Sequence, residues 1–348
     1  MKTFKLKIIT LAFGTVFLSS CTKLLYTSLD VLRPAKVAFE SDVNNVLIVN
    51  NTVPQPANDG HSTKFEYEKP KKDSINKDSL SIYCLGALKE DIESKGFFSS
   101  VQLSAESINK DTDFRPANYL PEGIIDSLCK SYHVDAIISL DKIKVRDYLT
   151  EALTSQTTYV TAQELNFESY WSIYHPNKES FYALQFKDTI YWETESTSRR
   201  KGIQNLPKRE DALVDGALYV GQKTVNRFIP HWEKVDRYFF NPNKRYFKEA
   251  MDSVYVKNWQ SAISTWETAL HKTKNVWKKA EAANNIAIAY EITGNINKAL
   301  EYAAISLNNL QQLAFIDYST SMQISNYVSE LEQRKKDVLI LKTQLDEK

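Results

Sequence analysis

Cys129 and His133 lie four residues apart on one face of a predicted helix, and a pair with this spacing can ligate a metal ion. The chain has five histidines, and they are scattered along it: His61, His133, His175, His231 and His271. No further ligand lies near this pair in the sequence. A buried cysteine beside a histidine at the C-terminal end of a helix, where the helix dipole favours a cation, explains the pair without a metal. We therefore expect no metal site and no cofactor.

Acidic residues in two long predicted strands offer a second kind of chemistry. Two carboxylates that converge in a cleft could bind or hydrolyse an envelope polymer, and the candidates are Glu164, Glu168, Glu193 and Glu195. Charged residues that alternate along an exposed strand face are the commoner cause of such a pattern. The sequence also contains no Gly-rich phosphate loop, no His-Glu-x-x-His and no Gly-x-Ser-x-Gly. We expect a protein that is not an enzyme, and a carbohydrate-binding or polymer-hydrolysing protein is the alternative.

The thiol of Cys21 is the third reactive group, and it follows a secretory leader, residues 1–20. The leader has a head with three lysines, an apolar core at 8–18 and two small residues, which is the order of a signal peptide. The core is too short for a spanning helix, which needs about 20 residues. The run Leu18-Ser19-Ser20-Cys21 resembles the bacterial lipobox, which implies cleavage before Cys21 and acylation of its sulfur. The alternative is an ordinary signal peptide cut nearby, with Cys21 a plain thiol.

Acylation would make the lipid bilayer the first partner of this chain. Several acyl chains together hold a protein to a membrane, because each buried CH₂ group contributes about 0.8 kcal/mol. Thr22 gives no acidic retention signal and no acidic run follows it. By resemblance to other lipoproteins, this implies an outer-membrane protein, anchored by diacylglycerol and palmitate, that faces the periplasm.

The charge balance excludes one class of partner. The full chain has 44 basic and 43 acidic residues, and removal of the leader with its three lysines leaves a small acidic excess. Nucleic-acid binding needs a basic surface, so we expect no nucleic-acid partner. A hydrophobic content of 43% with 12% aromatic residues is typical of folded globular domains.

Residues 43–240 are expected to form an α/β (or α+β) domain with the element order βαβαβββα. Apolar strands are predicted at 46–49, 97–104 and 134–145, with helices between them. The first of these helices ends at Gly96 and the second begins at Pro121. Residues 21–42 are predicted as a lipidated tether and residues 54–77 as a long exposed loop.

Three further elements complete this predicted domain. Residues 158–174 and 179–195 alternate between apolar and polar side chains and predict a hairpin of two long strands. A polar loop from Thr197 to Asn205 follows, in which Arg199-Arg200-Lys201 is expected to be solvated. A helix from about Lys208 to Phe228 carries Gly216 and Gly221, which we expect to permit close approach to the sheet.

The hairpin is rich in aromatic residues, and the alternation must place some of them on its outer face. An exposed aromatic patch there would be a protein or glycan contact. The candidate contact residues on the hairpin are Trp171, Tyr174, Tyr191 and Trp192.

Gly96-Phe97 in the second strand and Val134-Asp135-Ala136-Ile137-Ile138 in the third carry a resemblance to known envelope proteins. Residues 43–228 resemble the α/β domain of the Tol-system β-propeller protein, of the curli secretion-channel lipoprotein and of the outer-membrane activator of a penicillin-binding protein. The whole chain is also similar to an uncharacterised lipoprotein family of Bacteroidota. Both resemblances imply contact with other envelope proteins and no enzymatic activity.

Residues 245–348 are expected to form a second, all-α domain. Two segments align at an offset of 37 residues, with Ala250 on Ala287, Lys257 on Gly294 and Ala262 on Ala299. The second copy resembles a tetratricopeptide repeat, and the first departs from it by carrying Lys257 in place of glycine. Ile324, Leu331, Val338 and Leu345 recur every seven residues in a capping helix at 322–347 or, alternatively, a coiled-coil arm.

The repeats complete the set of expected contacts. On the concave repeat face, Asn284 and Tyr290 are the candidate partner contacts. Cys84 and Cys129 are predicted on the apolar sides of their helices, either free or bridged. The sequence therefore predicts a lipid-anchored, non-enzymatic interaction or assembly scaffold with an envelope protein partner.

Overall fold

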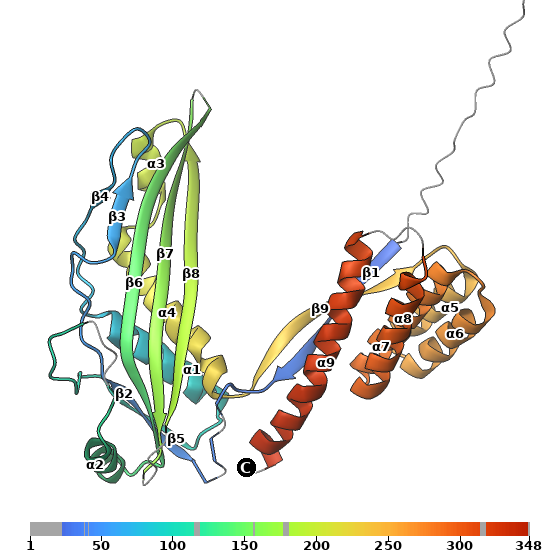
Figure 1. Cartoon of the computed structure of the whole chain (residues 1–348), viewed down its shortest axis with the longest axis horizontal. Helices are drawn as coiled ribbons and strands as arrows, with labels where there is room; N and C mark the ends of the chain where they lie inside the picture. Colours follow the sequence, from blue (N-terminus) through green and yellow to red (C-terminus); the bar gives the residue numbers. More distant parts are fainter. Residues whose placement is uncertain are drawn as a thin grey trace, which may run out of the picture. The chain divides into compact units, whose positions relative to one another are not determined.

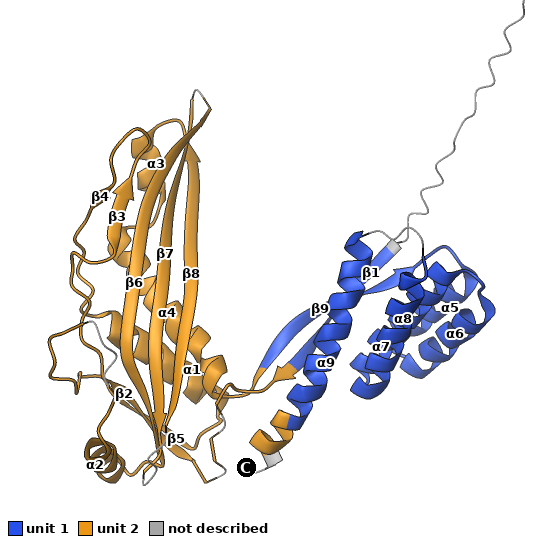
Figure 2. Cartoon of the chain, in the orientation of Figure 1, with its two compact units in different colours: residues 1–31, 232–339 blue, residues 32–231, 340–348 orange. Residues whose placement is uncertain are grey.

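The structure of the chain is a computed structural model that describes residues 23–37, 39–40, 42–114, 119–155, 157–176, 181–313 and 318–346. The expected leader and Cys21 lie outside the described residues. Two compact units are present (Figure 2). An α/β unit contains the stretch from Leu32 to His231 and the end of the chain from Ile340. A helical unit contains the chain up to Val31 and the stretch from Trp232 to Leu339. The chain is thus a mixed α/β region followed by a helical region, as expected.

Seven strands form the sheet of the α/β unit (Figure 1). The central strand is the long β6 (Ala136–Ser155), which pairs antiparallel with β7 (Thr158–Tyr174) along its length. On its other side β6 pairs in parallel with β2 (Asn45–Asn50) near its start and with β3 (His61–Lys64) further along. β5 (Ser100–Ser104), β4 (Lys71–Lys72) and β8 (Tyr182–Ser196) complete the sheet. β8 pairs with β7 and forms the predicted hairpin.

Two helices cover one face of this sheet, which we call the inner face. α1 (Leu80–Lys95) and α4 (Arg209–Phe228) pack there against Leu165, Phe167 and Trp171 in one apolar core. Gly216 lets α4 approach the sheet, because an added Cβ would overlap the ring of Phe167. Gly221 serves a different contact from the one expected: its added Cβ would overlap the main-chain oxygen of Cys84, so it permits close approach of α4 to α1.

α2 (Glu122–Tyr132) packs on the other, outer face of the sheet. Cys129 of α2 joins a small core with Leu47, Val49 and Ile137, whereas Cys84 of α1 lies in the inner core. Both cysteines are buried, as predicted, and both are free, because the sheet separates the two helices that carry them. Burial raises the pKa of the Cys129 thiol to about 11.

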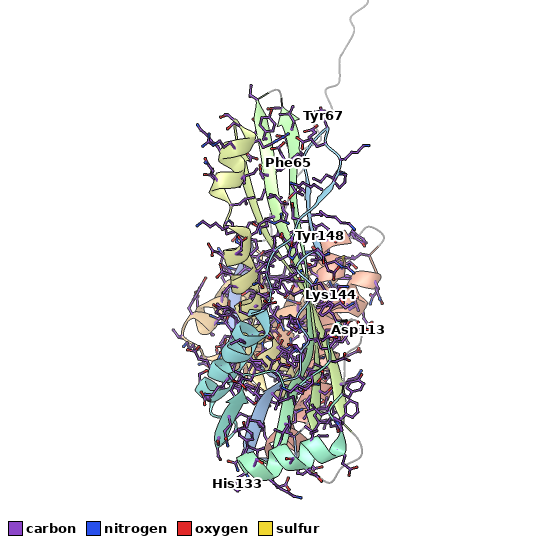
Figure 3. All side chains as sticks on the ribbon, turned by 90° about the vertical axis from the view of Figure 1, so that its left-hand side faces the viewer. Phe65, Tyr67, Asp113, His133, Lys144 and Tyr148 are labelled. Carbon is purple, nitrogen blue, oxygen red and sulfur yellow. The ribbon has the colours of Figure 1, made fainter. Side chains whose placement is uncertain are left out.

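Two segments of the α/β unit that were expected to be loops contain regular structure. The stretch 54–77 contains β3 and β4, which extend the sheet beside β6. The stretch 197–205 contains the helix α3 (Arg199–Asn205), capped by the side chain of Ser198. Gly202 places α3 close to the inner face, against Thr161. Arg199 is not simply solvated: it forms ion pairs with Glu151 and Glu68, at 2.9 and 2.6 Å, and its guanidinium lies over the ring of Phe65, near the end of the sheet (Figure 3).

Among the described residues, the helical unit contains α5 (Arg245–Tyr255), α6 (Trp259–Lys272), α7 (Val276–Ile292), α8 (Ile296–Gln311) and α9 (Tyr318–Asp346) as far as Leu339. The two copies match locally. Asn258 and Asn295 cap α6 and α8 in the same way, each accepting from a main-chain N–H three residues on. Lys257 has φ of 57° where Gly294 has 81°, so the lysine adopts the left-handed turn that glycine adopts at lower cost in the other copy.

α9 only partly follows its seven-residue pattern. Ile324 and Leu331 are buried in the helical unit, but Val338 and Leu345 are exposed at 41% and 44%. Arg334, which interrupts the apolar stripe, binds the buried carboxylate of Glu291. No helix in the described part of the chain is long and apolar enough to cross a membrane.

The expected tether at 21–42 is instead largely a strand. β1 (Lys23–Arg33) pairs with β9 (His231–Asn241), and the two form a separate two-stranded sheet. Ser28 donates a hydrogen bond to Asp236, and the ring of Tyr26 lies 6.3 Å from that of Tyr238. Strand β1 therefore begins two residues after Cys21 in the sequence.

Candidate functional site

The inner face of the sheet changes from apolar to polar along β6, β7 and β8. From Leu165 towards Trp171, the inward side chains of β7 pack mostly in the apolar core. In the other direction, from Leu165 towards the start of β7, the inward positions of the three strands include Asp147, Gln163, Thr161 and Thr194. Gln163 pairs with Leu149 on one side and Trp192 on the other, and Thr161 pairs with Glu151 and Thr194. The amide of Gln163 and the hydroxyls of Thr161 and Thr194 have no hydrogen-bond partner among the described residues. We call this set the Gln163 layer.

A network of buried charges lies next to the Gln163 layer. Arg209, the first residue of α4, donates from Nε to Oδ2 of Asp147 and from Nη1 to Oδ2 of Asp73, both at 2.6 Å. The side chain of Asp147 is fully buried. Burial alone would raise the pKa of Asp73, but hydrogen bonds from Thr63 and Arg209 hold it below the ordinary value. Arg209 therefore fixes the start of α4 to β3, β4 and β6 together.

His61 gives this network the appearance of a catalytic dyad. Its Nδ1 lies 3.1 Å from Oδ2 of Asp147, the arrangement in which a carboxylate orients a histidine base. The residue is only 2% exposed, however, and its Nε2 is buried, so no substrate atom reaches it in this conformation. Nearby, burial lowers the pKa of Lys77 to about 8, although Asp59 and Asp147 oppose this. The geometry supports a structural role for His61 and Asp147.

A cleft of about 320 Å³ opens beside Gln163, between the inner face and the turn from α3 to α4. We call it the α3–α4 cleft. Its walls are mostly apolar, and they include Leu149, Gln163, Ile203, Leu206, Lys208 and Arg209. The guanidinium of Arg209 donates hydrogen bonds to Asp147, Asp73, Thr63 and Ser62. Arg209 therefore forms part of the cleft wall and is not a binding group for a ligand. Gln163 lines the cleft but is only 1% exposed, and the donor group and the acceptor of its amide are buried without partners, so a ligand reaches them only when the cleft wall moves.

A second cavity of about 430 Å³ lies by the start of α2 and is lined by Asn51, Tyr119, Leu120 and Ile124 among others. The nearby carboxylate of Asp141 is buried, which raises its pKa. It accepts hydrogen bonds from Asn51, Ser139 and Ser172, at 3.0, 2.7 and 2.5 Å. Because its partners are all internal, Asp141 serves the packing of the strands.

The four contact residues predicted on the hairpin divide between the two faces. Trp171 is 1% exposed and Tyr174 is 2% exposed, so neither can meet a partner at the surface. Trp171 packs against Phe228 of α4, and the Tyr174 hydroxyl accepts a hydrogen bond from the main chain of Leu120. Trp192 is half-buried on the inner face, whereas Tyr191 is 53% exposed on the outer face. Tyr191 alone of the four is fully available on the surface.

The four candidate carboxylates lie on the outer face of the hairpin. Glu164 accepts a hydrogen bond from Asn166, and Glu168 forms an ion pair with Lys187 at 3.7 Å. Glu193 accepts a hydrogen bond from Tyr191, and Glu195 is exposed. None of the four lines the cavities described here, so the arrangement offers a substrate no enclosed pair of carboxylates.

In the helical unit, only one of the two residues expected to meet a partner, Asn284, contacts the chain's own strand β9. Asn284 is 2% exposed, and its Nδ2 donates to the main-chain oxygen of Tyr238 at 3.4 Å. Its neighbour Asn285 accepts from the N–H of Phe240 at 2.8 Å and donates to the oxygen of the same residue at 2.7 Å. Tyr290 stacks on Tyr302. Asn284 is therefore an internal contact, and Asn285 binds both the main-chain N–H and the main-chain oxygen of one residue of β9, Phe240.

A buried ionic cluster joins the same elements. Glu291 of α7 has a fully buried carboxylate, and Arg237 of β9 donates to both of its oxygens, at 2.7 and 2.9 Å. Arg334 and Tyr327 of α9 also donate to Glu291. Burial alone would raise the pKa of Glu291, but Arg237 and Arg334 hold it below the ordinary value. The cluster thus ties β9, α7 and α9 together.

His61, Asp147, Gln163 and Arg209 were not predicted as a group, because they are far apart in the sequence. For two of them the sequence contains a recognisable pattern. Asp147 and Gln163 each lie two residues from a buried apolar residue of the same strand, Val145 and Leu165, and so share its inward-facing side. A polar residue in an apolar phase indicates a buried polar site. No group of residues suited to holding a metal ion occurs within the described ranges.

Comparison with known proteins gives families without an assigned activity. Among solved structures, a putative neuraminyllactose-binding hemagglutinin homolog from Helicobacter pylori is 8% identical, covers 55% of this chain and 89% of its own, and has a TM-score of 0.27. A minor lipoprotein from Acinetobacter baumannii (12% identity, 55% and 97% coverage, TM-score 0.23) and an uncharacterised protein (12%, 55% and 96%, TM-score 0.22) are similarly remote. At these TM-scores the likenesses carry no conclusion about this chain. No curated protein matches it significantly.

Two families match by sequence. Residues 248–333, within the helical unit, match the family described as Domain of unknown function (DUF6340). Residues 43–240, which contain nearly all of the α/β unit and more than half of the chain, match another. The chain therefore belongs to the family described as Domain of unknown function (DUF8603).

Proposed function

We propose that this chain is a lipid-anchored protein of a bacterial cell envelope that acts as a non-enzymatic interaction or assembly scaffold. In this proposal Cys21 is acylated, and the protein faces the periplasm from the outer membrane. The run Leu18 to Cys21 after a basic and apolar leader supports the anchor. The helical hairpins are tetratricopeptide-like, and they hold β9 as such repeats would hold an extended segment of another protein.

The partner binds through the α/β unit, because β9 already occupies Asn284 and Asn285 on the expected contact face of the helical hairpins. The observation that carries this proposal is the amide of Gln163. It is buried at the α3–α4 cleft with its donor and its acceptor both unpartnered. Leaving both groups unpaired costs folding free energy, about 1–3 kcal/mol for each such group. A side chain retained at that cost is suited to binding.

The chain itself indicates what an amide of this kind binds. Asn285 uses its donor and acceptor to hold the N–H and the oxygen of Phe240. Gln163 offers the same pair of groups, and apolar walls flank it. The ligand of the cleft is accordingly an extended protein segment that presents the main-chain N–H and oxygen of one residue to Gln163 and an apolar side chain to Leu149 and Ile203.

Photo-crosslinking in cells tests the cleft. A photoreactive residue at Gln204, on the exposed rim of the cleft, is expected to capture a specific envelope protein, identified by mass spectrometry. The substitution Gln163→Leu should abolish this capture and raise the stability of the α/β unit, since it replaces an unpaired amide with an apolar group of similar size. Gln185→Leu, on the exposed outer face of β8, is the matched control and should leave capture unchanged.

Two results would count against this assignment. Capture that persists in the Gln163→Leu protein would place the partner elsewhere than on the amide. Capture from a photoreactive residue at Tyr191, with none at Gln204, would move the contact to the outer face of the hairpin.

The anchor is tested separately, by growing cells with labelled palmitate. The full chain should incorporate the label and fractionate with the outer membrane, and Cys21→Ser should lose both properties, because acylation needs the sulfur. Label in the Cys21→Ser protein, or a mature chain that still carries its leader, would contradict the proposed attachment.

A further inference from the structure

One end of the helical unit gathers the start of β1, the end of α8, the start of α7 and the start of α9. Leu24, the second residue of β1, packs against a cluster that contains Phe240, Leu310 and Ile324. Trp277 near the start of α7 and Leu313 just after α8 pack against the same cluster. In Figure 1 the beginning of β1 lies beside the upper end of α9. We call this end of the unit the β1 end.

The β1 end exposes aromatic and apolar side chains. Tyr318 and Met322, in the first turns of α9, are exposed at 80% and 50%, and Tyr26 of β1 is exposed at 74%. Such side chains normally lie at the boundary between lipid headgroups and water when they are found at a membrane. Their exposure at one end of a unit indicates a contact surface for an amphipathic partner.

The same end also carries positive charge. The turn that joins α6 to α7 lies at this end, because Trp277 of the cluster stands in the first turn of α7. Lys272, the last residue of α6, and Lys274 in the turn are both exposed. Lys279 lies in the first turns of α7. Lysines beside aromatic residues favour a surface of anionic headgroups.

The short stretch of chain between the proposed lipid anchor and β1 indicates that the partner of this surface is the membrane. Only Thr22 separates Cys21 from Lys23, the first residue of β1, so the two α-carbons are at most about 7 Å apart. We propose that the β1 end of the helical unit lies against the lipid surface, with Tyr318 and Met322 at headgroup level. This inference rests on the proposed acylation of Cys21. A long tether would let the unit stand away from the bilayer, but the strand β1 leaves no such tether.

The opposite end of the helical unit supplies a matched control. Tyr255, after which α5 gives way to α6, is exposed at 68%, comparable to Tyr318. α6 runs for 14 residues from that turn to the β1 end, a rise of about 21 Å. Tyr255 is therefore an exposed tyrosine of the same unit that the proposed orientation keeps out of the lipid.

The test uses the acylated full chain in vesicles of phosphatidylethanolamine and phosphatidylglycerol, with the photoreactive p-benzoylphenylalanine in place of Tyr318 or Tyr255. After illumination, mass spectrometry should find a phospholipid adduct on the Tyr318 variant and none on the Tyr255 variant. Labelled palmitate and flotation with the vesicles report independently whether the anchor is present.

Each other outcome is decisive. Equal adducts at the two positions, or none at either, in a chain that carries palmitate and floats would overturn the proposed orientation and leave the anchor standing. A chain without palmitate that fails to float would overturn the proposed anchor, and the orientation with it.

Discussion

Replacing Gly221 with alanine is expected to destabilise the α/β unit strongly. The new Cβ would overlap the main-chain oxygen of Cys84 and lie 3.0 Å from the Cβ of Ala87, so helix α1 would have to move. A main-chain atom inside a helix cannot rotate away as a side chain can. Overpacking of this kind costs about 1–3 kcal/mol, which exceeds the gain of up to about 1 kcal/mol that alanine brings to a helix over glycine.

The control for this prediction is Gly86→Ala in the neighbouring helix α1. A Cβ on Gly86 would have no atom within 4 Å, so the gain in helix propensity should appear undiminished as a small stabilisation. Urea unfolding of the two variants beside the parent chain measures both effects. If Gly221→Ala were as stable as Gly86→Ala, the close contact of α4 with α1 would be wrong.

Removing the carboxylate of Glu291 is expected to destabilise the helical unit. Glu291→Ala would remove the carboxylate that Arg237 and Arg334 share, and Arg237, whose side chain is only 7% exposed, would keep only its pair with the more exposed Glu330. Removing one partner of a buried ion pair costs about 3–5 kcal/mol. Thermal unfolding followed by circular dichroism should show this loss for Glu291→Ala. Glu249→Ala, which breaks an exposed pair with Arg245, should show no measurable change.

The same cluster predicts how the helical unit responds to acid. The pKa of Glu291 in the folded chain is below the ordinary value of 4.5, so folding favours its ionised form. The stabilisation is therefore present above about pH 4.5 and is lost as the pH falls through the folded pKa. Glu291→Gln should remove this part of the pH dependence. Parallel pH profiles for the parent chain and the variant would contradict the assignment.

Local patterns in the sequence were enough to predict the elements that bury one apolar face. The spacing of Leu80, Cys84 and Leu88 and the glycine at 96 predict α1, and Gly96 is its left-handed C-cap. Alternation predicts the hairpin, and its apolar phase, with Leu165 and Phe167, is buried. These elements can be predicted because the spacing of apolar residues that defines them repeats within a few residues of the chain.

The elements that were missed depend on partners far along the chain. β1 was interpreted as a tether because its strand partner, β9, follows the entire α/β unit. β3 is short and polar, and its place in the sheet depends on Arg209 and Asp147. The Gln163 layer forms only when three strands align in register. Trp171 and Tyr174 were assigned to contacts because composition alone does not tell which face of a strand a helix covers.

The pairing of β1 with β9 sets an order of events for the chain as it folds. Strand β1 has no strand partner until the stretch from Leu32 to His231 has been made and β9 has followed it. Closing so long a loop by chance is entropically costly, and prior folding of that stretch shortens the effective loop. We therefore expect the α/β unit to fold before the helical unit is complete, so β1 stays unpaired, and open to proteolysis, until β9 can reach it.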